Sequence, residues 1–357
     1  MTRARQQQII LSETPWYHLV NRCVRRAFLC GVDSISGQNY GHRREWIEQL
    51  MFKLASVFSV DIAAFAVMSN HYHLVIRVDA DQAQNWSDQE VFERWTQLFT
   101  GPSYLQTYLN QPERSPAAMQ PKIDELAQTY RERLMDLSWY MRTLNESIAR
   151  MANKEDGVKG HFWEGRFKSQ ALLDEQAILS VMAYVDLNPV RAAMSETLTE
   201  SDHTSIQRRL QAILGTQPKS SEPELDVEAL HLSKGAQSFL EGVLDLPTSP
   251  LMDFNPHNQN DDRGSKQIQF ALEDYIEFVD YLGHAIHPHK HGHIPEAIPR
   301  LMSQLNFTDK LIEQMQQGRL LNSFGSAIGN LTHLKNRQTQ RHQAFNKGNK
   351  QAKAVFA

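Results

Sequence analysis

The feature that most constrains the fold of this sequence is a pair of strand-like runs separated by two polar residues. Residues 61–68 (DIAAFAVM) and 71–78 (HYHLVIRV) are rich in apolar and β-branched side chains, and Ser69-Asn70 lies between them. Two such runs joined by so short a polar connection predict an antiparallel hairpin. Further strands are expected over 14–24 and within 157–173.

Helical patterns surround these strands. Apolar residues at helical spacing, together with capping residues, predict helices over 43–58, 87–99, 121–153, 175–187 and 202–214. Residues 100–120 hold three prolines and no periodicity, so they are expected to form a loop. A strand, a helix, a hairpin and then more helices predict an α+β fold with helices on one face of an antiparallel sheet.

The polar segment 215–224 (GTQPKSSEPE) is the best candidate for a domain boundary. We therefore expect an N-terminal domain over 1–214, a linker over 215–224 and a mostly helical C-terminal extension over 225–357. The extension ends in a basic tail, because no acidic residue follows Glu313. The tail's basic residues are Arg319, Lys335, Arg337, Arg341, Lys347, Lys350 and Lys353. They could neutralise phosphates or belong to a solvated terminus.

Overall composition indicates an ordinary globular chain. The net charge is −4, from 37 basic and 41 acidic residues, so the total charge by itself does not indicate nucleic-acid binding. Only Cys23 and Cys30 are present, which excludes a disulfide framework. No apolar run is long enough to cross a bilayer, and the N-terminus lacks the pattern of a secretory signal. A cytoplasmic location is expected.

The second run of the hairpin begins with His71-Tyr72-His73. Residues two apart in a strand point to the same face of the sheet, so both imidazoles are expected to project side by side, with Tyr72 on the other face. Two parallel imidazoles on a rigid strand can bind one divalent cation through ring nitrogens. The alternative is that both histidines are ordinary surface or hydrogen-bonded residues.

The helix expected over 175–187 carries Tyr184, and Asn188 follows four positions later, hence on the same face. A phenol is a poor nucleophile at neutral pH because its free pKa is about 10. A metal-bound phosphate nearby would favour its attack, and the Asn188 amide oxygen could complete the coordination of the ion. The alternative is a core tyrosine and an asparagine that ends the helix before Pro189.

Cations and aromatic residues gather in two further places. Segment 160–169 (GHFWEGRFKS) combines three aromatics with glycines and cations, and such residues can stack on unpaired bases and bind phosphates. Arg22, Arg25 and Arg26 lie at and just after the first strand and could form a phosphate clamp. The alternatives are a core-packing strand and a solvated loop.

Four motifs in a fixed order resemble a known family. They are YHLVNR (17–22), VMSNHYHLVI (67–76), GHFWEGRFKSQ (160–170) and YVDLNPVRAA (184–193). Together they resemble the Y1 tyrosine (HUH-type) transposases of the IS200 type, and especially the REP-associated tyrosine transposases. The resemblance covers about residues 14–195.

This resemblance implies a ferredoxin-like HUH endonuclease domain, over 1–214 in this chain, that binds Mg²⁺ or Mn²⁺ through His71, His73 and Asn188. It implies that Tyr184 attacks a phosphodiester in single-stranded or hairpin DNA formed by palindromic repeats. The products are a 5′-phosphotyrosine and a free 3′-OH that can carry out strand transfer. The DNA-contact candidates are Arg22, Arg25, Arg26, Asn70, Trp163, Arg166, Lys168 and Arg191. A monomer or homodimer associated with the nucleoid is expected.

The chain departs from the compact family pattern by its C-terminal extension. This extension contains His284, His287, His289, His291 and His293. These histidines could form a second metal site, and the alternative is a flexible polar loop. Two other functions remain open: a repeat-DNA-binding regulator derived from a transposase but without catalysis, and an unrelated metalloenzyme that uses the histidine pair on a small molecule.

Overall fold

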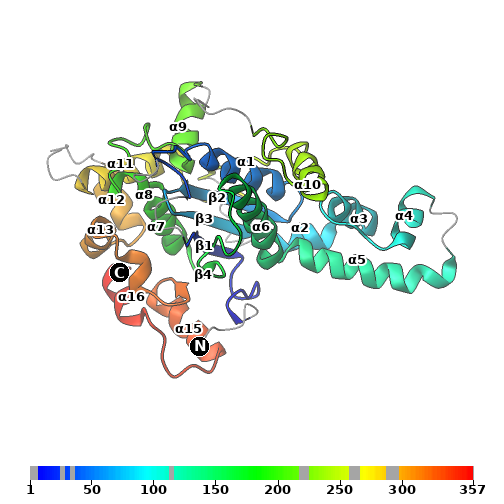
Figure 1. Ribbon diagram of the computed structural model, residues 1–357. Coiled ribbons are helices and arrows are strands. Elements are labelled where there is room, and N and C mark those ends of the chain that lie inside the picture. The colour runs from blue at the N-terminus through cyan, green and yellow to red at the C-terminus, as the bar shows by residue number, and fades with distance from the viewer. Residues whose placement is uncertain are drawn as a thin grey trace.

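A five-stranded sheet forms the centre of the computed structural model (Figure 1). The structure describes residues 7–24, 29–32, 37–111, 116–216, 225–256, 266–286 and 297–356. The sheet has the order β2-β3-β1-β4-β5, and helices surround it. The α+β class is therefore confirmed. Within the described ranges, no helix combines the length and the apolar character needed to span a membrane.

Four of the strands form where the sequence predicts them, whereas the short β5 lies in the C-terminal extension, where only helices were expected. The strands are β1 (Trp16–Arg22), β2 (Val60–Val67), β3 (His71–Val78), β4 (Lys168–Leu172) and β5 (Ala327–Ile328). Strand β2 pairs with β3 as the predicted antiparallel hairpin, β1 is antiparallel to both β3 and β4, and β5 joins β4 in parallel.

The register of β1 decides which side chains share a face. His18 lies opposite Val75 of β3 and Gln170 of β4, while Val20 lies opposite His73. Because neighbouring residues on paired strands point to the same side, His18, His73 and Gln170 belong to one face of the sheet. Tyr72 belongs to the other face, where its hydroxyl donates to Asn145 Oδ1 at 2.7 Å.

Both faces of the sheet are covered, so the expectation of helices on one face is wrong. The face that carries Tyr72 packs against α1 (Arg43–Ala55) and α6 (Leu137–Glu155), whereas the face that carries His73 packs against α7 (Glu175–Asp186) (Figure 1). The physical reason is that almost every residue of β2 and β3 is buried. Strands buried on both sides need apolar cover on both sides.

The remaining helices follow the expected order, apart from an unpredicted helix over 80–85 and two further differences. They are α2 (Ala80–Asn85), α3 (Asp88–Thr96), α4 (Ser103–Asn110), α5 (Gln120–Leu134), α8 (Asn188–Arg191), α9 (Ser205–Leu214), α10 (Lys234–Leu244), α11 (Leu272–Ile286), α12 (Ala297–Gln304), α13 (Asp309–Gln316), α14 (Leu320–Ser323), α15 (Leu331–Gln340) and α16 (Asn349–Val355). The loop expected over 100–120 is wrong in part, because α4 forms there around the fully buried Leu105.

A further difference concerns Asn188, which Pro189 was expected to keep away from helical angles, although the predicted end of the helix over 175–187 is confirmed within one residue. The short helix α8 instead begins at Asn188, with Pro189 in its first turn. Proline is tolerated there because the first amides of a helix have no intrahelical acceptor. The predicted start of α7 is confirmed, since the Asp174 side chain accepts from Ala177 N at 2.9 Å.

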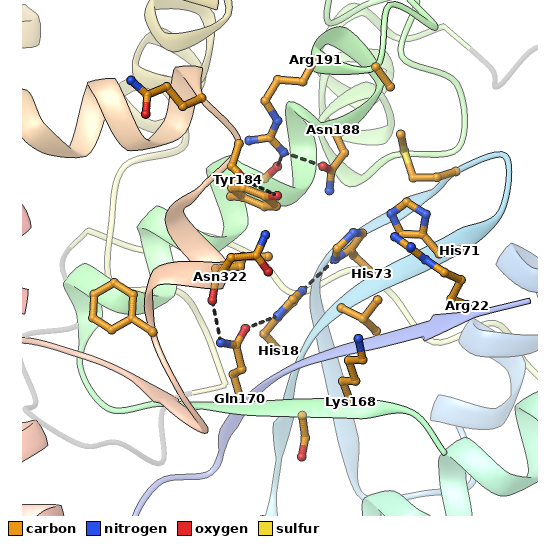
Figure 2. A pocket seen from close by; sticks show the side chains of 18 of the residues that line it. His18, Arg22, His71, His73, Lys168, Gln170, Tyr184, Asn188, Arg191 and Asn322 are labelled. Carbon is orange, nitrogen blue, oxygen red and sulfur yellow. Dashed lines mark hydrogen bonds between the residues drawn. The ribbon is translucent and has the colours of Figure 1, made fainter. Parts of the chain in front are cut away.

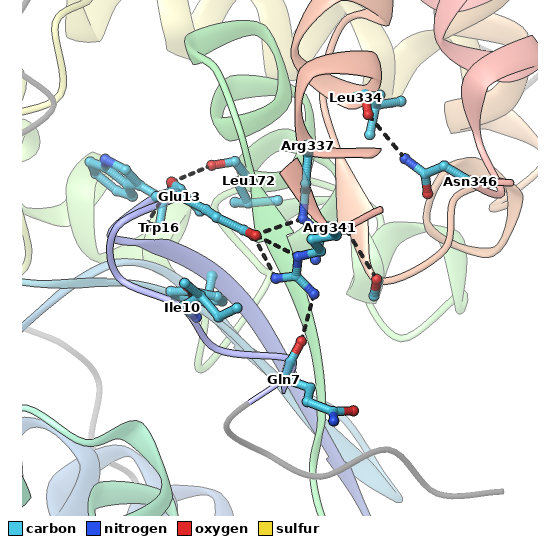
Figure 3. A network of polar contacts seen from close by, with 12 residues as sticks. Gln7, Ile10, Glu13, Trp16, Leu172, Leu334, Arg337, Arg341 and Asn346 are labelled. Carbon is cyan, nitrogen blue, oxygen red and sulfur yellow. Dashed lines mark hydrogen bonds and ion pairs between the residues drawn. The ribbon is translucent and has the colours of Figure 1, made fainter. Parts of the chain in front are cut away.

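The C-terminal extension folds back onto the N-terminal segment. Glu13, just before β1, bonds to two guanidiniums of α15 and its end, Arg337 and Arg341 (Figure 3). Arg337 Nε lies 2.8 Å from Glu13 Oε2, and Arg341 also donates to the Gln7 carbonyl at 2.6 Å. Two cations of the predicted basic tail are therefore held by protein groups.

We expect Glu13→Gln to lower the free energy of unfolding by about 3 kcal/mol at neutral pH, because it leaves two mostly buried guanidiniums without their carboxylate. The matched control is Glu146→Gln, whose exposed pairs with Arg142 and Arg150 should contribute less than about 1 kcal/mol. Urea denaturation followed by circular dichroism measures both variants. Equal losses in the two variants would contradict the role given to Glu13.

The pKa of Glu13 also predicts how the stability of the protein changes in acid. Burial raises the pKa of Glu13, but hydrogen bonds and charge from Arg341 and Arg337 outweigh it and hold the pKa below its ordinary value of 4.5. The stabilisation is therefore fully present above about pH 4.5 and is lost as the pH falls through the lowered pKa. Glu13→Gln should remove this part of the acid transition.

Candidate functional site

A cavity of about 670 Å³ opens on the sheet face that carries His73 (Figure 2). Three parts of the chain line it: the strands β1, β3 and β4, the helices α7 and α8, and the C-terminal segment around α13 and α14. Its lining includes His18, Arg22, His71, His73, Lys168, Gln170, Tyr184, Asn188, Arg191, Gly318, Asn322 and Lys347. The catalytic positions predicted from the sequence thus meet in one place.

The two histidines of β3 lie together as the strand alternation predicts. Their ring centroids are 4.9 Å apart with planes at 73°. Nδ1 of His71 lies 2.5 Å from Asn70 Oδ1, and Nδ1 of His73 lies 2.8 Å from His18 Nε2. Among the described residues, neither Nε2 atom has a hydrogen-bond partner. Two nitrogens are thus left for a ligand.

All three imidazoles are held neutral at physiological pH. Burial lowers the pKa of His18 and of His71 to about 4, with repulsion from His71 and Arg22 respectively adding to the effect. Burial, followed by repulsion from His18 and His71, lowers the pKa of His73 well below its ordinary value. Neutral imidazole is the form that binds metal ions.

Tyr184 approaches the histidine pair from α7. Its ring centroid lies 6.3 Å from that of His73, in an edge-to-face arrangement. The Arg191 guanidinium lies over its ring, 3.6 Å from the centroid. The phenol hydroxyl donates to the Gly318 carbonyl at 3.3 Å. The phenol is therefore at the wall of a polar cavity, beside the half-buried guanidinium of Arg191, and in contact with the C-terminal segment.

Asn188 lies one turn after Tyr184 and is held by Arg191. Its Oδ1 accepts from Arg191 Nη2 at 2.5 Å, and the same nitrogen donates to the Tyr184 carbonyl at 2.6 Å. Asn188 Nδ2 is buried with no hydrogen-bond partner in the described part of the chain. Burial lowers the pKa of Arg191 to about 10. Arg191, expected to contact DNA, thus organises the helix around Tyr184.

The predicted DNA-contact residues are divided between the cavity and other places. Arg22 and Lys168 are exposed and line the cavity, and Asn70 supports His71 from the hairpin turn. Trp163 lies on the other face, where Nε1 donates to the Asn145 carbonyl at 2.8 Å and the ring contacts Tyr72. Arg166 is exposed and is not part of the cavity lining. Arg25 and Arg26 lie outside the described residues.

Several lining residues escaped the sequence reasoning. His18 and Gln170 stand in the motifs YHLVNR and GHFWEGRFKSQ, and strand alternation could have placed His18 beside His73 once the pairing of β1 with β3 was known. The residues of the C-terminal segment, such as Gly318 and Asn322, carry no recognisable signal. They are more than 120 residues from Tyr184 along the chain, and only the folded structure brings them there.

A second group of possible metal ligands lies elsewhere. Glu45, Glu48 and His203 offer ligand atoms within 4.8 Å of one another, so they could hold a cation. Glu48 is, however, already paired with both His203 and Arg208. Of the histidine-rich segment, only His284 is described, with Asp280 at 3.3 Å, while His287, His289, His291 and His293 lie outside the described residues.

Comparison with known proteins gives one distant likeness. No sequence profile of a known family matches this chain, and no curated protein matches it. Among solved structures, it is similar to a REP-associated tyrosine transposase bound to a REP hairpin, with a TM-score of 0.35 and 13% sequence identity. The similarity covers 63% of this chain and 93% of the other. A likeness this distant does not assign the chain to that family.

Proposed function

We propose that this chain is a divalent-metal-dependent endonuclease and strand transferase acting on single-stranded or hairpin DNA, with Tyr184 as its nucleophile. The observation that carries the proposal is the shared cavity: Tyr184 and the pair His71 and His73 line one polar space of about 670 Å³. A phosphate and a cation fit a space of this size. We assign the chemistry to residues 1–214, arranged as a ferredoxin-like HUH-type domain, with the C-terminal segment around α13 and α14 completing the wall of the cavity.

The histidine pair suits a divalent cation. The two Nε2 atoms are without partners among the described residues, and Asn188 supplies an amide one helical turn after Tyr184. Asn188 Oδ1 already accepts from Arg191 and would have to share its second lone pair. A bound Mn²⁺ or Mg²⁺ would supply charge neutralisation at the scissile phosphate, and imidazole donors favour Mn²⁺ of the two.

The proposed reaction is a transesterification. Tyr184 Oη loses its proton to solvent and forms a bond to phosphorus, while the bond from phosphorus to the 3′ oxygen breaks and that oxygen takes up a proton. The products are a 5′-phosphotyrosine on the enzyme and a free 3′-OH, which can reverse the step on a new strand. Arg191, which covers the Tyr184 ring, favours a developing phenolate by its positive charge.

The direct test is incubation of the full chain with labelled single-stranded and hairpin oligonucleotides in Mn²⁺ or Mg²⁺. We expect a protein–DNA adduct that survives denaturation and carries label 3′ of the cut. Absence of an adduct with every hairpin, with either ion, while metal and DNA both bind, would favour the alternative of a non-catalytic repeat-binding regulator. The observation that favours this alternative is the hydrogen bond from the Tyr184 hydroxyl to the Gly318 carbonyl.

Arg22 and Lys168 are expected to bind phosphates at the mouth of the cavity. Each of Arg22→Ala and Lys168→Ala should weaken DNA binding and lower the slope of log affinity against log salt by roughly 0.7 for single-stranded DNA. Lys122→Ala is the matched control, because Lys122 is exposed on α5, away from the cavity. Fluorescence anisotropy over a salt series measures the slopes. Identical slopes for all three variants would place the DNA elsewhere.

A further inference from the structure

Gln170 on β4 is locked in one orientation by the C-terminal segment (Figure 2). Its Nε2 donates to two main-chain carbonyls, Leu321 at 3.0 Å and Gly325 at 2.9 Å. The reversed orientation would set the amide oxygen against both carbonyl oxygens, so the hydrogen-bond pattern decides the assignment. Gln170 Oε1 therefore faces His18 and lies 3.2 Å from the Nδ1 atom of that ring.

The orientation of Gln170 determines the tautomer of His18. An amide oxygen only accepts, so His18 Nδ1 must carry the proton of this hydrogen bond. His18 is 2% exposed, and its two hydrogen-bond partners, Gln170 and His73, are neutral groups. A second proton would bury an uncompensated charge, so His18 Nε2 is left as an acceptor.

The tautomer of His18 in turn determines that of His73. With His18 Nε2 accepting, His73 Nδ1 must donate across their 2.8 Å contact, and the two ring planes are nearly parallel, at 14°. His73 Nε2 then carries a lone pair. His71 reaches the same state independently, since its Nδ1 faces Asn70 Oδ1.

We propose that Gln170 and His18 form a positioning relay that holds His73 in the Nδ1-protonated tautomer and so presents its Nε2 lone pair to the metal ion. This inference rests on the proposed function in assigning the ion to the histidine pair. Metal-binding histidines ordinarily donate their second nitrogen to an outer partner, which fixes the ring and raises its basicity. Here the relay ends on Leu321 and Gly325, so the C-terminal segment is coupled to the metal site.

The first test needs neither metal nor DNA. Long-range ¹H–¹⁵N spectra of the histidine-labelled, metal-free full chain report which ring nitrogen carries the proton, with His18 and His73 assigned by single substitutions. We expect a protonated Nδ1 and an unprotonated Nε2 on both rings. A protonated Nε2 on His73 in the unsubstituted protein would overturn the relay, whatever the protein does to DNA.

The second test measures metal affinity. Gln170→Met keeps the side-chain length but removes both halves of its hydrogen bonding, and we expect Mn²⁺ affinity, followed by electron paramagnetic resonance, to fall about ten- to hundredfold. The control is Gln317→Met, at a residue that lines the same cavity but donates to Glu313 instead. Equal affinities in the two variants would overturn the relay, while failure of the unsubstituted chain to bind Mn²⁺ would count against the proposed function.

Discussion

Tyr184→Phe is expected to abolish the covalent DNA adduct and to reduce cleavage at least about a thousandfold, with DNA affinity almost unchanged. The phenylalanine ring keeps its place beside His73 and under Arg191, because both contacts involve the ring and not the hydroxyl. Only the attacking oxygen and its hydrogen bond to Gly318 are lost. Denaturing gels with labelled hairpin oligonucleotides measure the adduct, and anisotropy measures binding.

Tyr72→Phe is the matched control for this experiment. Tyr72 lies between the two histidines in the sequence, but its hydroxyl points to the opposite face and bonds to Asn145. We expect this variant to keep its adduct and to lose only about 1 kcal/mol of stability from one buried hydrogen bond. An adduct on the Tyr184 variant, or its loss from the Tyr72 variant alone, would reverse the assignment of the nucleophile.

The second large effect is expected from His71→Ala. Removing one of two imidazole ligands should lower Mn²⁺ affinity more than the about hundredfold that is typical for losing an outer partner, and cleavage should fall with it. His71 is the better choice of the pair for this test because, among the described residues, its one hydrogen bond is to Asn70, whereas His73 is hydrogen-bonded to the buried His18. Calorimetric titration with Mn²⁺ measures the loss.

His284→Ala serves as the control for nonspecific histidine effects. His284 is half-buried on α11 and lies beside Asp280, outside the cavity of the histidine pair. Its substitution should leave both metal affinity and cleavage unchanged. If His284→Ala weakened Mn²⁺ binding as strongly as His71→Ala, the ion would have to be placed in the C-terminal extension instead.

Local patterns in the sequence were sufficient for the parts of the site that lie on single elements. The alternation of β3 put His71 and His73 on one face and Tyr72 on the other, as the structure shows. The four-residue spacing of Tyr184 and Asn188 put both at the cavity. These predictions succeed because strand and helix periodicities are properties of neighbouring residues.

Predictions that depended on long-range packing did less well. Trp163 looked like a base-stacking residue from its cationic and aromatic neighbours, yet it packs against Tyr72 on the far face. The prediction that helices cover only one face was wrong. An apolar run does not by itself show whether one or both sides of a strand are buried. The loop-like composition of residues 100–120 also gave no indication of α4, a helix that packs through the buried Leu105.

The sequence by itself determined strands β1 to β4, the helix caps and the residue pairs that local geometry places together. Only the tertiary structure decided that Gly318, Leu321 and Gly325 return to the cavity from the C-terminal extension and engage Tyr184 and Gln170. The physical reason is that such contacts join residues more than 130 positions apart. They depend on how whole elements pack, which no short stretch of sequence encodes.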